Sequence, residues 1–345
     1  MGNDHSSSDF GNSSKTYIFR LKSSHKYFGD YNLLEDQKSK KFLMQKEMLY
    51  YTSDNMDHEY KMLIQKMKKY DCNFLQIHTA DIISEKGLCS NFYKINYVID
   101  YPKCDLITEI NEHKEEKRVF SEGRIWNIMN DLISGLAELQ KINTLHNHLS
   151  NQSIFLDEIG NVKLMYPDII KQMPNFAFII GSNDRLGKYL SPEEIKCLKK
   201  KNYDNNINRF ISDVFVLGMI LLEIIELKVS NEFFNYHECL IYKVLLEKKI
   251  AAKHNIYSED LFNVLRKMLI FDEKKRPNFI ELLKYFKEQK IKREQESKNL
   301  KEKEDAVPLK EISKVTENKI IMKSPESNAK LNKRNYEKSC KYILI

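Results

Sequence analysis

The side chains whose types can bind a charged group or move a proton include Lys46, Glu59, His148 and Tyr166. Lys46 and Glu59 can form an ion pair, and a lysine held in this way can bind phosphate oxygens without a metal ion. His148 can accept a proton, because an unperturbed histidine titrates at about pH 6.5. Tyr166 offers only a neutral phenol, whereas Mg²⁺ prefers anionic oxygen ligands. Whether these side chains can act together depends on the elements that position them.

The cysteines add neither a zinc site nor a disulfide framework. No two of the six, at positions 72, 89, 104, 197, 239 and 340, are spaced as CxxC, and no signal-peptide segment precedes them. The most apolar stretch, Val214 to Leu227, is interrupted by Glu223 and has 14 residues, fewer than the roughly 20 that a membrane span needs. We therefore expect a cytoplasmic protein in a reducing compartment, with this stretch as a buried helix.

Hydrophobic periodicity predicts that the first part of the chain is rich in strands. Alternating apolar residues within 17–51 predict strands and hairpins, and further strands are expected at 74–77 and 93–101. Between them, residues 55–70 have apolar side chains at helical spacing after a polar start. This predicted helix carries Glu59.

After Pro102 the pattern becomes mostly helical. Short strands are expected near residues 162–165. Helices are predicted around residues 125–139, 214–225, 242–246, 260–269 and 279–286. The helix at 214–225 is apolar nearly all round, which is typical of a helix at the centre of a helical lobe.

Composition and charge restrict the class of protein and its partners. With 42% hydrophobic and 30% charged residues, collagen-like, wholly disordered and disulfide-scaffold proteins are excluded. The net charge is +7, from 56 basic and 49 acidic residues, and residues 287–345 alone contribute +6, from 16 basic and 10 acidic residues. The remainder is nearly neutral, so we expect no nucleic-acid partner.

The first 16 residues are rich in Ser, Asn and Gly and have little to bury, so we expect a disordered arm. Gly2 and Ser6 match the pattern M-G-x-x-x-[ST], in which Gly2 is acylated with myristate after removal of Met1. One acyl chain gives only marginal anchoring. The arm therefore predicts peripheral membrane contact through Gly2, and stable anchoring would need a second signal.

The segment LHNHLSNQSIFLDEIGNVKLMYPD, residues 145–168, resembles the catalytic and metal-binding loops of eukaryotic protein kinases, where HRD-L-x-x-x-N is followed by a hairpin and DFG. Further landmarks occur in the order found in that family: FLMQK ending at Lys46, Glu59 on the predicted helix, YLSPE at 189–193, SDVFVLGMILLEI from Ser212, and Arg276-Pro277. The chain is therefore similar to the protein kinase superfamily over residues 17–287.

This resemblance implies an α+β, bilobal, kinase-like fold. The expected N-terminal lobe, residues 17–101, is β-rich and contains helix C, and the expected C-terminal lobe, residues 102–287, is helical. Residues 1–16 precede this domain. Residues 288–345 form a tail rich in Lys and Glu that we expect to be partly helical or disordered.

The resemblance also implies that three positions with catalytic roles carry other residues. The catalytic aspartate corresponds to His148, the metal-binding asparagine to Ser153, and the DFG aspartate to Tyr166. The glycine-rich loop is also missing, because SSHKYFGDYN offers only Gly29. We therefore expect no required cofactor and no Mg²⁺ site. The candidate residues for ATP binding are Lys46, Glu59, Ile99 and Tyr101. The alternative is that Lys46 and Glu59 lie apart and form no ion pair.

Residues that resemble the structural framework of the family are present. Glu193 and Arg276 match a pair that forms a buried salt bridge in kinases. His146 and Asp213 match residues that brace the catalytic loop. A chain with a complete framework and altered catalytic positions is typical of a pseudokinase.

Two functions follow from the resemblance. The first is a pseudokinase that acts as a scaffold or allosteric regulator of another protein, with an active kinase as one candidate partner. The alternative is a divergent active Ser/Thr protein kinase, in which Lys46 holds phosphates, His148 is the base and Asp168 is a displaced metal ligand.

Overall fold

The computed structural model describes residues 17–25, 29–51, 73–86, 91–146, 149–166, 189–200, 207–228, 231–252 and 256–289, together with 291 and 295. Several features expected from the sequence lie outside these residues. They are the arm with Gly2, the helix with Glu59, the base position His148, Asp168 and most of the tail. The chain forms two units, of which the first ends at Pro102 and the second begins at Lys103.

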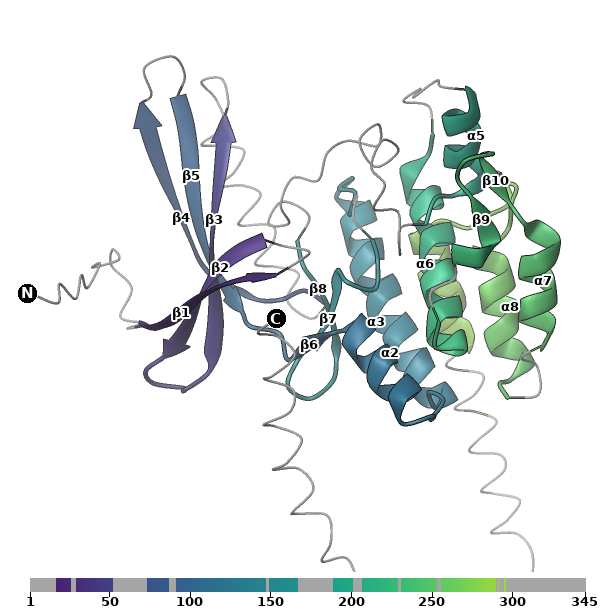
Figure 1. Ribbon diagram of the computed structural model, residues 1–345, viewed down its shortest axis with the longest axis horizontal. Coiled ribbons are helices and arrows are strands. Elements are labelled where there is room, and N and C mark those ends of the chain that lie inside the picture. The colour runs from purple at the N-terminus through teal and green to yellow at the C-terminus, as the bar shows by residue number, and fades with distance from the viewer. Residues whose placement is uncertain are drawn as a thin grey trace, which may run out of the picture. The chain divides into compact units, whose positions relative to one another are not determined.

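The first unit is built on a five-stranded antiparallel sheet with the order β1-β2-β3-β5-β4 (Figure 1). Its strands are β1 (Tyr17–His25), β2 (Gly29–Asp36), β3 (Phe42–Tyr51), β4 (Ile77–Lys86) and β5 (Asn91–Asp100). The strands and hairpins predicted within residues 17–51 are therefore confirmed.

The strand predicted at residues 74–77 is wrong in its position. Only Ile77 belongs to β4, which continues to Lys86. Phe74 and Leu75 are each 2% exposed, so this apolar run reflects burial before the strand begins. The more polar residues that follow pair with β5 up to Lys86 and Asn91.

The two faces of this sheet bury different side chains. On one face Leu34, Leu43 and Val98 form an apolar cluster, against which Tyr17 packs. Cross-strand partners share a face of a sheet. The opposite face carries six buried side chains from β3 and β5, in the register Met44 with Ile99, Lys46 with Tyr97, and Met48 with Ile95.

The second unit is mainly helical. Its helices are α2 (Leu106–Glu115), α3 (Glu122–Lys141), α5 (Pro192–Lys200), α6 (Arg209–Glu226), α7 (Lys243–Ala252) and α8 (Glu259–Met268), and residues 279–289 are also helical. It also contains the 3₁₀ helix η2 (Asn231–Phe233). Short strands form two small sheets, β6 (Cys104–Asp105), β7 (Ile154–Leu156) and β8 (Val162–Leu164) in the order β6-β7-β8, and β9 (Phe234–Asn235) with β10 (Leu240–Ile241). The predicted α+β class is confirmed.

Helix α6 lies at the centre of the helical unit. Thirteen of its residues are buried, and Asn208 caps its first turn by accepting a hydrogen bond from the Ile211 N–H. Gly218 brings α6 close to the end of α8, at Met268 and Leu269. No helix among the described residues combines the length and hydropathy that crossing a membrane requires.

Candidate functional site

The loop before β7 uses the side chain of Ser153 to hold its own backbone. The Ser153 hydroxyl accepts a hydrogen bond from the Ser150 N–H, with 3.0 Å between N and O, and donates one to the Ser150 carbonyl at 2.9 Å. The Ser153 N–H also donates to that carbonyl at 3.0 Å. Ser153 is fully buried. In this arrangement its hydroxyl closes a turn and does not extend toward a ligand.

Tyr166 follows β8 and is buried, with 3% of the residue exposed. Its neighbour Met165 is fully buried. A buried phenol is a neutral oxygen, and it lacks the charge that a carboxylate supplies to Mg²⁺. Among the residues that the structure describes, no group of three or more His, Cys, Asp or Glu side chains is arranged to hold a metal ion.

A buried carboxylate joins the loop before β7 to the segment before α5. Glu223 of α6 is 1% exposed. One of its oxygens accepts a hydrogen bond from the Asn151 amide at 2.6 Å, and the other accepts one from the Tyr189 hydroxyl. A buried charge requires such partners. A glutamate inside a buried apolar helix is the sequence signal for this junction, although the sequence alone indicates only an interruption of the apolar stretch.

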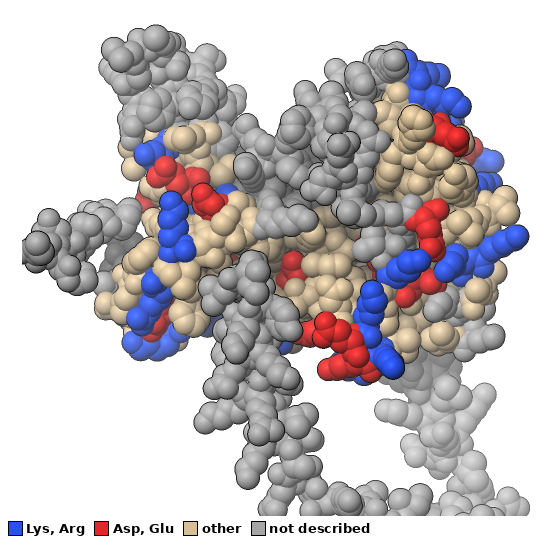
Figure 2. All heavy atoms as spheres, in the orientation of Figure 1, with Lys and Arg blue, Asp and Glu red and all other residues tan. Residues whose placement is uncertain are grey.

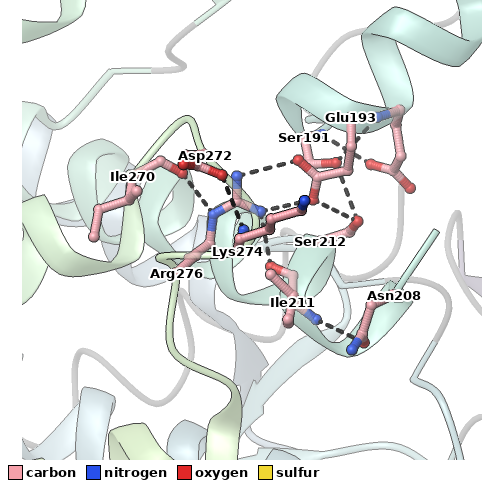
Figure 3. A network of polar contacts seen from close by, with 10 residues as sticks. Ser191, Glu193, Asn208, Ile211, Ser212, Ile270, Asp272, Lys274 and Arg276 are labelled. Atoms are coloured by element: carbon pink, nitrogen blue, oxygen red, sulfur yellow. Dashed lines mark hydrogen bonds and ion pairs between the residues drawn. The ribbon is translucent and has the colours of Figure 1, made fainter.

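The structure brings Glu193 and Arg276 together (Figure 3). The Arg276 guanidinium donates to both carboxylate oxygens, at 2.7 and 3.1 Å. It also donates to the carbonyls of Ile211 and Ile270, at 3.0 and 2.7 Å. The Ser212 hydroxyl donates to the same carboxylate at 2.8 Å. The pair and its partners therefore connect α5, the first turn of α6 and the turn that follows α8.

The environment of Glu193 stabilises its charged form. Burial alone would raise its pKa, but the hydrogen bonds and positive charge of Arg276, together with the Ser212 hydroxyl, outweigh burial and hold the pKa below its usual range. Fork-shaped pairing of this kind is the strongest form of side-chain ion pair. Glu193 and Arg276 are 7% and 3% exposed, so the pair is buried.

Helix α5 begins with a capping box that we did not predict from the sequence. The Ser191 hydroxyl accepts a hydrogen bond from the Glu194 N–H at 3.3 Å, and the Glu194 carboxylate accepts one from the Ser191 N–H at 2.8 Å. The spacing S-x-x-E before a helix was the available signal. Ser191 also donates to the Ser212 hydroxyl at 3.1 Å, so the cap adjoins the Glu193 pair.

Two further residues that the resemblance matches to the family framework, His146 and Asp213, belong to the second unit. His146 is buried, with 1% exposed. Burial raises the pKa of Asp213 to about 8, and the nearby carboxylate of Glu194 adds to this increase, whereas the charge of Arg209 opposes it. The structure thus places a carboxyl group at the start of α6 in conditions that disfavour its charge.

Of the residues expected at a nucleotide site, Glu59 lies outside the described residues, and the other three lie in or next to the sheet of the first unit. Lys46 is 3% exposed, between Met44 and Met48 on β3. Ile99 is 1% exposed on β5, and Tyr101 follows that strand. Ser153 and Tyr166 belong to the second unit.

The end of β5 is held by a short polar network. Asp100 accepts a hydrogen bond from the His78 ring, with 2.7 Å between the atoms, and one from the Gln76 N–H at 3.2 Å. Burial raises the pKa of Asp100, but the hydrogen bond and charge of His78 and the Gln76 N–H outweigh it and lower the pKa overall. The network fixes the backbone next to Ile99 and Tyr101.

Charges on the surface are locally balanced on the face shown in Figure 2, where blue and red side chains lie next to one another. In the helical unit, Lys249 lies within 3.6 Å of Glu226 and 3.4 Å of Glu232, and Lys228 lies 2.6 Å from Glu232. Exposed pairs of this kind contribute little to stability. The absence of a nucleic-acid partner stays a prediction.

Comparison with known proteins identifies the family. A family model described as protein tyrosine and serine/threonine kinase matches residues 35–286. The chain is 29% identical over 182 residues to the probable serine/threonine-protein kinase nek3 of Dictyostelium discoideum, covering 52% of this chain and 15% of that protein. It is 29% identical over 188 residues to the probable serine/threonine-protein kinase nek2 of the same organism, covering 52% and 41%.

A third relative is the G2-specific protein kinase fin1 of Schizosaccharomyces pombe, 26% identical over 199 residues, with 52% of this chain and 26% of that protein covered. The chain spans less than half the length of each of these three relatives. The matched region contains β3, both loops that flank the β7–β8 hairpin, and the Glu193–Arg276 pair. The chain belongs to the protein tyrosine and serine/threonine kinase family.

Proposed function

We propose that this kinase domain is a pseudokinase, which regulates or scaffolds another protein and does not transfer phosphate by the metal-dependent route. Phosphate transfer in this fold depends on an aspartate that accepts the hydroxyl proton and on an asparagine and an aspartate that hold Mg²⁺. At the matching positions this chain has His148, Ser153 and Tyr166. Each replacement removes a negative charge or a strong oxygen ligand.

The proposal rests on the surroundings of Ser153 and Tyr166, which are the two of these three residues that the structure describes. Tyr166 is a buried phenol, and Ser153 uses its hydroxyl within the turn that it closes. Neither side chain supplies an anionic oxygen to a metal ion. The contacts that hold the helical unit, above all Glu193 with Arg276 and Glu223 with Asn151, involve other residues. The fold can therefore be stable without a nucleotide or a metal ion, as a binding domain requires.

An active Ser/Thr kinase is the second candidate. The names of the relatives favour it, because nek3, nek2 and fin1 are described as protein kinases. In this alternative Lys46 holds the phosphates, His148 accepts the proton and Asp168 replaces the DFG carboxylate. Only this alternative predicts ATP turnover that depends on Mg²⁺.

The deciding experiment measures phosphate transfer from radiolabelled ATP by the full chain, to itself and to a mixture of protein substrates, with Mg²⁺ and with EDTA. We expect no transfer above the level of a Lys46→Met variant. Transfer that needs Mg²⁺ and is lost in Lys46→Met would contradict the pseudokinase proposal. The triple variant His148→Asp, Ser153→Asn and Tyr166→Asp restores the two carboxylates and the amide that an active kinase has at these positions.

We also propose that the protein is cytoplasmic and attaches to a membrane surface through an acylated Gly2. The M-G-x-x-x-[ST] pattern supports this proposal. Expression of the full chain with a myristate analogue should label the native protein but not Gly2→Ala, and the membrane fraction should fall in this variant. An unlabelled native protein would exclude acylation.

A further inference from the structure

Two tyrosines meet on the face of the sheet that carries Lys46. Tyr31, in β2, is 5% exposed, and Tyr101 follows β5. Their hydroxyl oxygens lie 3.5 Å apart, and their ring centroids lie 6.0 Å apart with the ring planes inclined by 37°. Both residues belong to the first unit, so this contact is internal to that unit.

The register of the strands places this contact on the Lys46 side of the sheet. Leu33 pairs with Met44, which pairs in turn with Ile99. Side chains two residues apart in a strand share a face. Tyr31 therefore shares a face with Leu33, Met44 and Lys46, and opposite to the face where Tyr17 packs.

The two rings approach each other from strands that are not neighbours. β3 lies between β2 and β5 in the sheet, so the two backbones are separated by about two strand spacings, or about 10 Å. The two side chains therefore meet on the face of the sheet that carries Met44 of β3. Met44 is fully buried. The face of the sheet that carries the buried Lys46 is thus occupied by side chains of the chain itself.

In a kinase fold this face has another occupant. The strand-three lysine contacts the phosphates of ATP, and a glycine-rich loop between the first two strands covers them. Glycine at that point allows the backbone to approach the nucleotide, because it has no side chain. In this chain the beginning of β2 carries Tyr31, with its large side chain directed along the face that a nucleotide would need.

We propose that Tyr31, together with Tyr101, closes the Lys46 face of the sheet to ATP. This inference rests on the proposed pseudokinase function and explains it at the nucleotide as well as at the metal. The lysine remains in place, and the tyrosine pair blocks access to it. Removal of either ring should open a site for an adenine nucleotide that binds without a metal ion.

The test uses the full chain and its Tyr31→Ala and Tyr101→Ala variants. Tyr17→Ala is the matched control, because it removes a tyrosine from the opposite face of the same sheet. Binding of ATP in EDTA is measured by equilibrium titration with a fluorescent ATP analogue and by the rise in melting temperature, since a ligand that binds only the folded state stabilises it. Circular dichroism shows which variants fold. If Tyr31→Ala does not fold, Tyr101→Ala still tests the proposal, because Tyr101 is only half-buried.

We expect the two ring deletions to bind ATP at least about tenfold more tightly than the wild type and Tyr17→Ala. The gain should disappear when Lys46→Met is added. Equal binding by the wild type and the folded ring deletions would overturn the proposed closure, whether all of them bind or none does. Neither of these two outcomes, equal binding by all variants or binding by none, would contradict the pseudokinase proposal. Mg²⁺-dependent phosphate transfer by the wild type would overturn both proposals.

Discussion

The hydroxyl group of Ser153 and the backbone of Ser150 form a closed pair, in which the hydroxyl accepts from the Ser150 N–H and donates to the Ser150 carbonyl. The kinase resemblance matches Ser153 to a position that supplies an oxygen to a metal ion in active kinases. Here the same position supports the loop itself. The side chain has therefore a structural use that accounts for its complete burial without any ligand.

This pairing predicts that Ser153→Ala destabilises the domain. The change leaves the buried N–H of Ser150 without its acceptor, which costs about 1–3 kcal/mol. Urea denaturation followed by circular dichroism measures the difference. Ser24→Ala, at an exposed position of β1, should have little effect, and an equally small change in Ser153→Ala would show that the turn does not depend on the hydroxyl.

The buried Glu193–Arg276 pair should be the most sensitive point of the helical unit. Arg276→Ala leaves a buried carboxylate without its charge partner and should cost about 3–5 kcal/mol. Arg266 provides a matched control, because it pairs with Glu259 while their side chains are 42% and 59% exposed. Arg266→Ala should cost less than about 1 kcal/mol. Both variants are compared by urea denaturation.

A comparison of melting temperatures between two variants tests the alignment with the kinase loops. We expect His148→Ala to leave the melting temperature almost unchanged, whereas Arg276→Ala lowers it strongly. Equal melting temperatures of these two variants would contradict the assignment of Arg276 to the framework and of His148 to the catalytic base position.

The sequence was sufficient to predict those features that depend on local pattern. Alternating apolar residues predict β1 to β3, and the apolar run around Leu221 predicts α6, because burial on one or all sides leaves a regular trace in the sequence. The α+β class and the kinase resemblance follow from the order of such segments and of the motifs between them.

Other features depend on residues that are distant in sequence, and no local pattern reveals them. The contact of Tyr31 with Tyr101 requires the strand order β2-β3-β5. The hydrogen bonds of Glu223 with Asn151 and Tyr189 join three separate segments. The capping box at Ser191 is different, because its spacing was visible in the sequence and only its use as a cap required the structure.

The close packing of α6 on the end of α8 predicts that a side chain at Gly218 lowers the stability of the domain. A Cβ atom at Gly218 would lie 2.8 Å from Leu269 Cδ2, 3.0 Å from Leu269 Cγ and 3.0 Å from Met268 Cβ. Gly218→Ala should therefore destabilise the domain by about 1–3 kcal/mol through overpacking.

A second glycine in a helix is the control for this substitution. Gly123 lies in the first turn of α3, and a Cβ atom added there would have no other atom within 4 Å. Gly123→Ala should stabilise the domain by up to about 1 kcal/mol through lower backbone entropy of the unfolded chain. Thermal melting of the two variants should therefore give shifts of opposite sign. A stabilising Gly218→Ala would mean that α6 and α8 can move apart at little cost.

The raised pKa of Asp213 predicts a pH dependence of stability with a definite sign. The pKa of this carboxyl is about 8 in the folded protein, whereas its ordinary value is 3.8. Between these two values the folded chain holds a proton that the unfolded chain has released, so the free energy of unfolding falls as pH rises from about 4 to about 8.

Asp213→Asn removes this contribution, because an amide has no charge to bury. The variant should have a higher melting temperature than the wild type at pH 8 and a similar one at pH 4. The pKa of Glu194 is also raised, so some slope should persist in the variant. A lower melting temperature of Asp213→Asn at pH 8 would show instead that the charged carboxylate is required in the folded state, as the kinase resemblance implies for a residue that braces the catalytic loop.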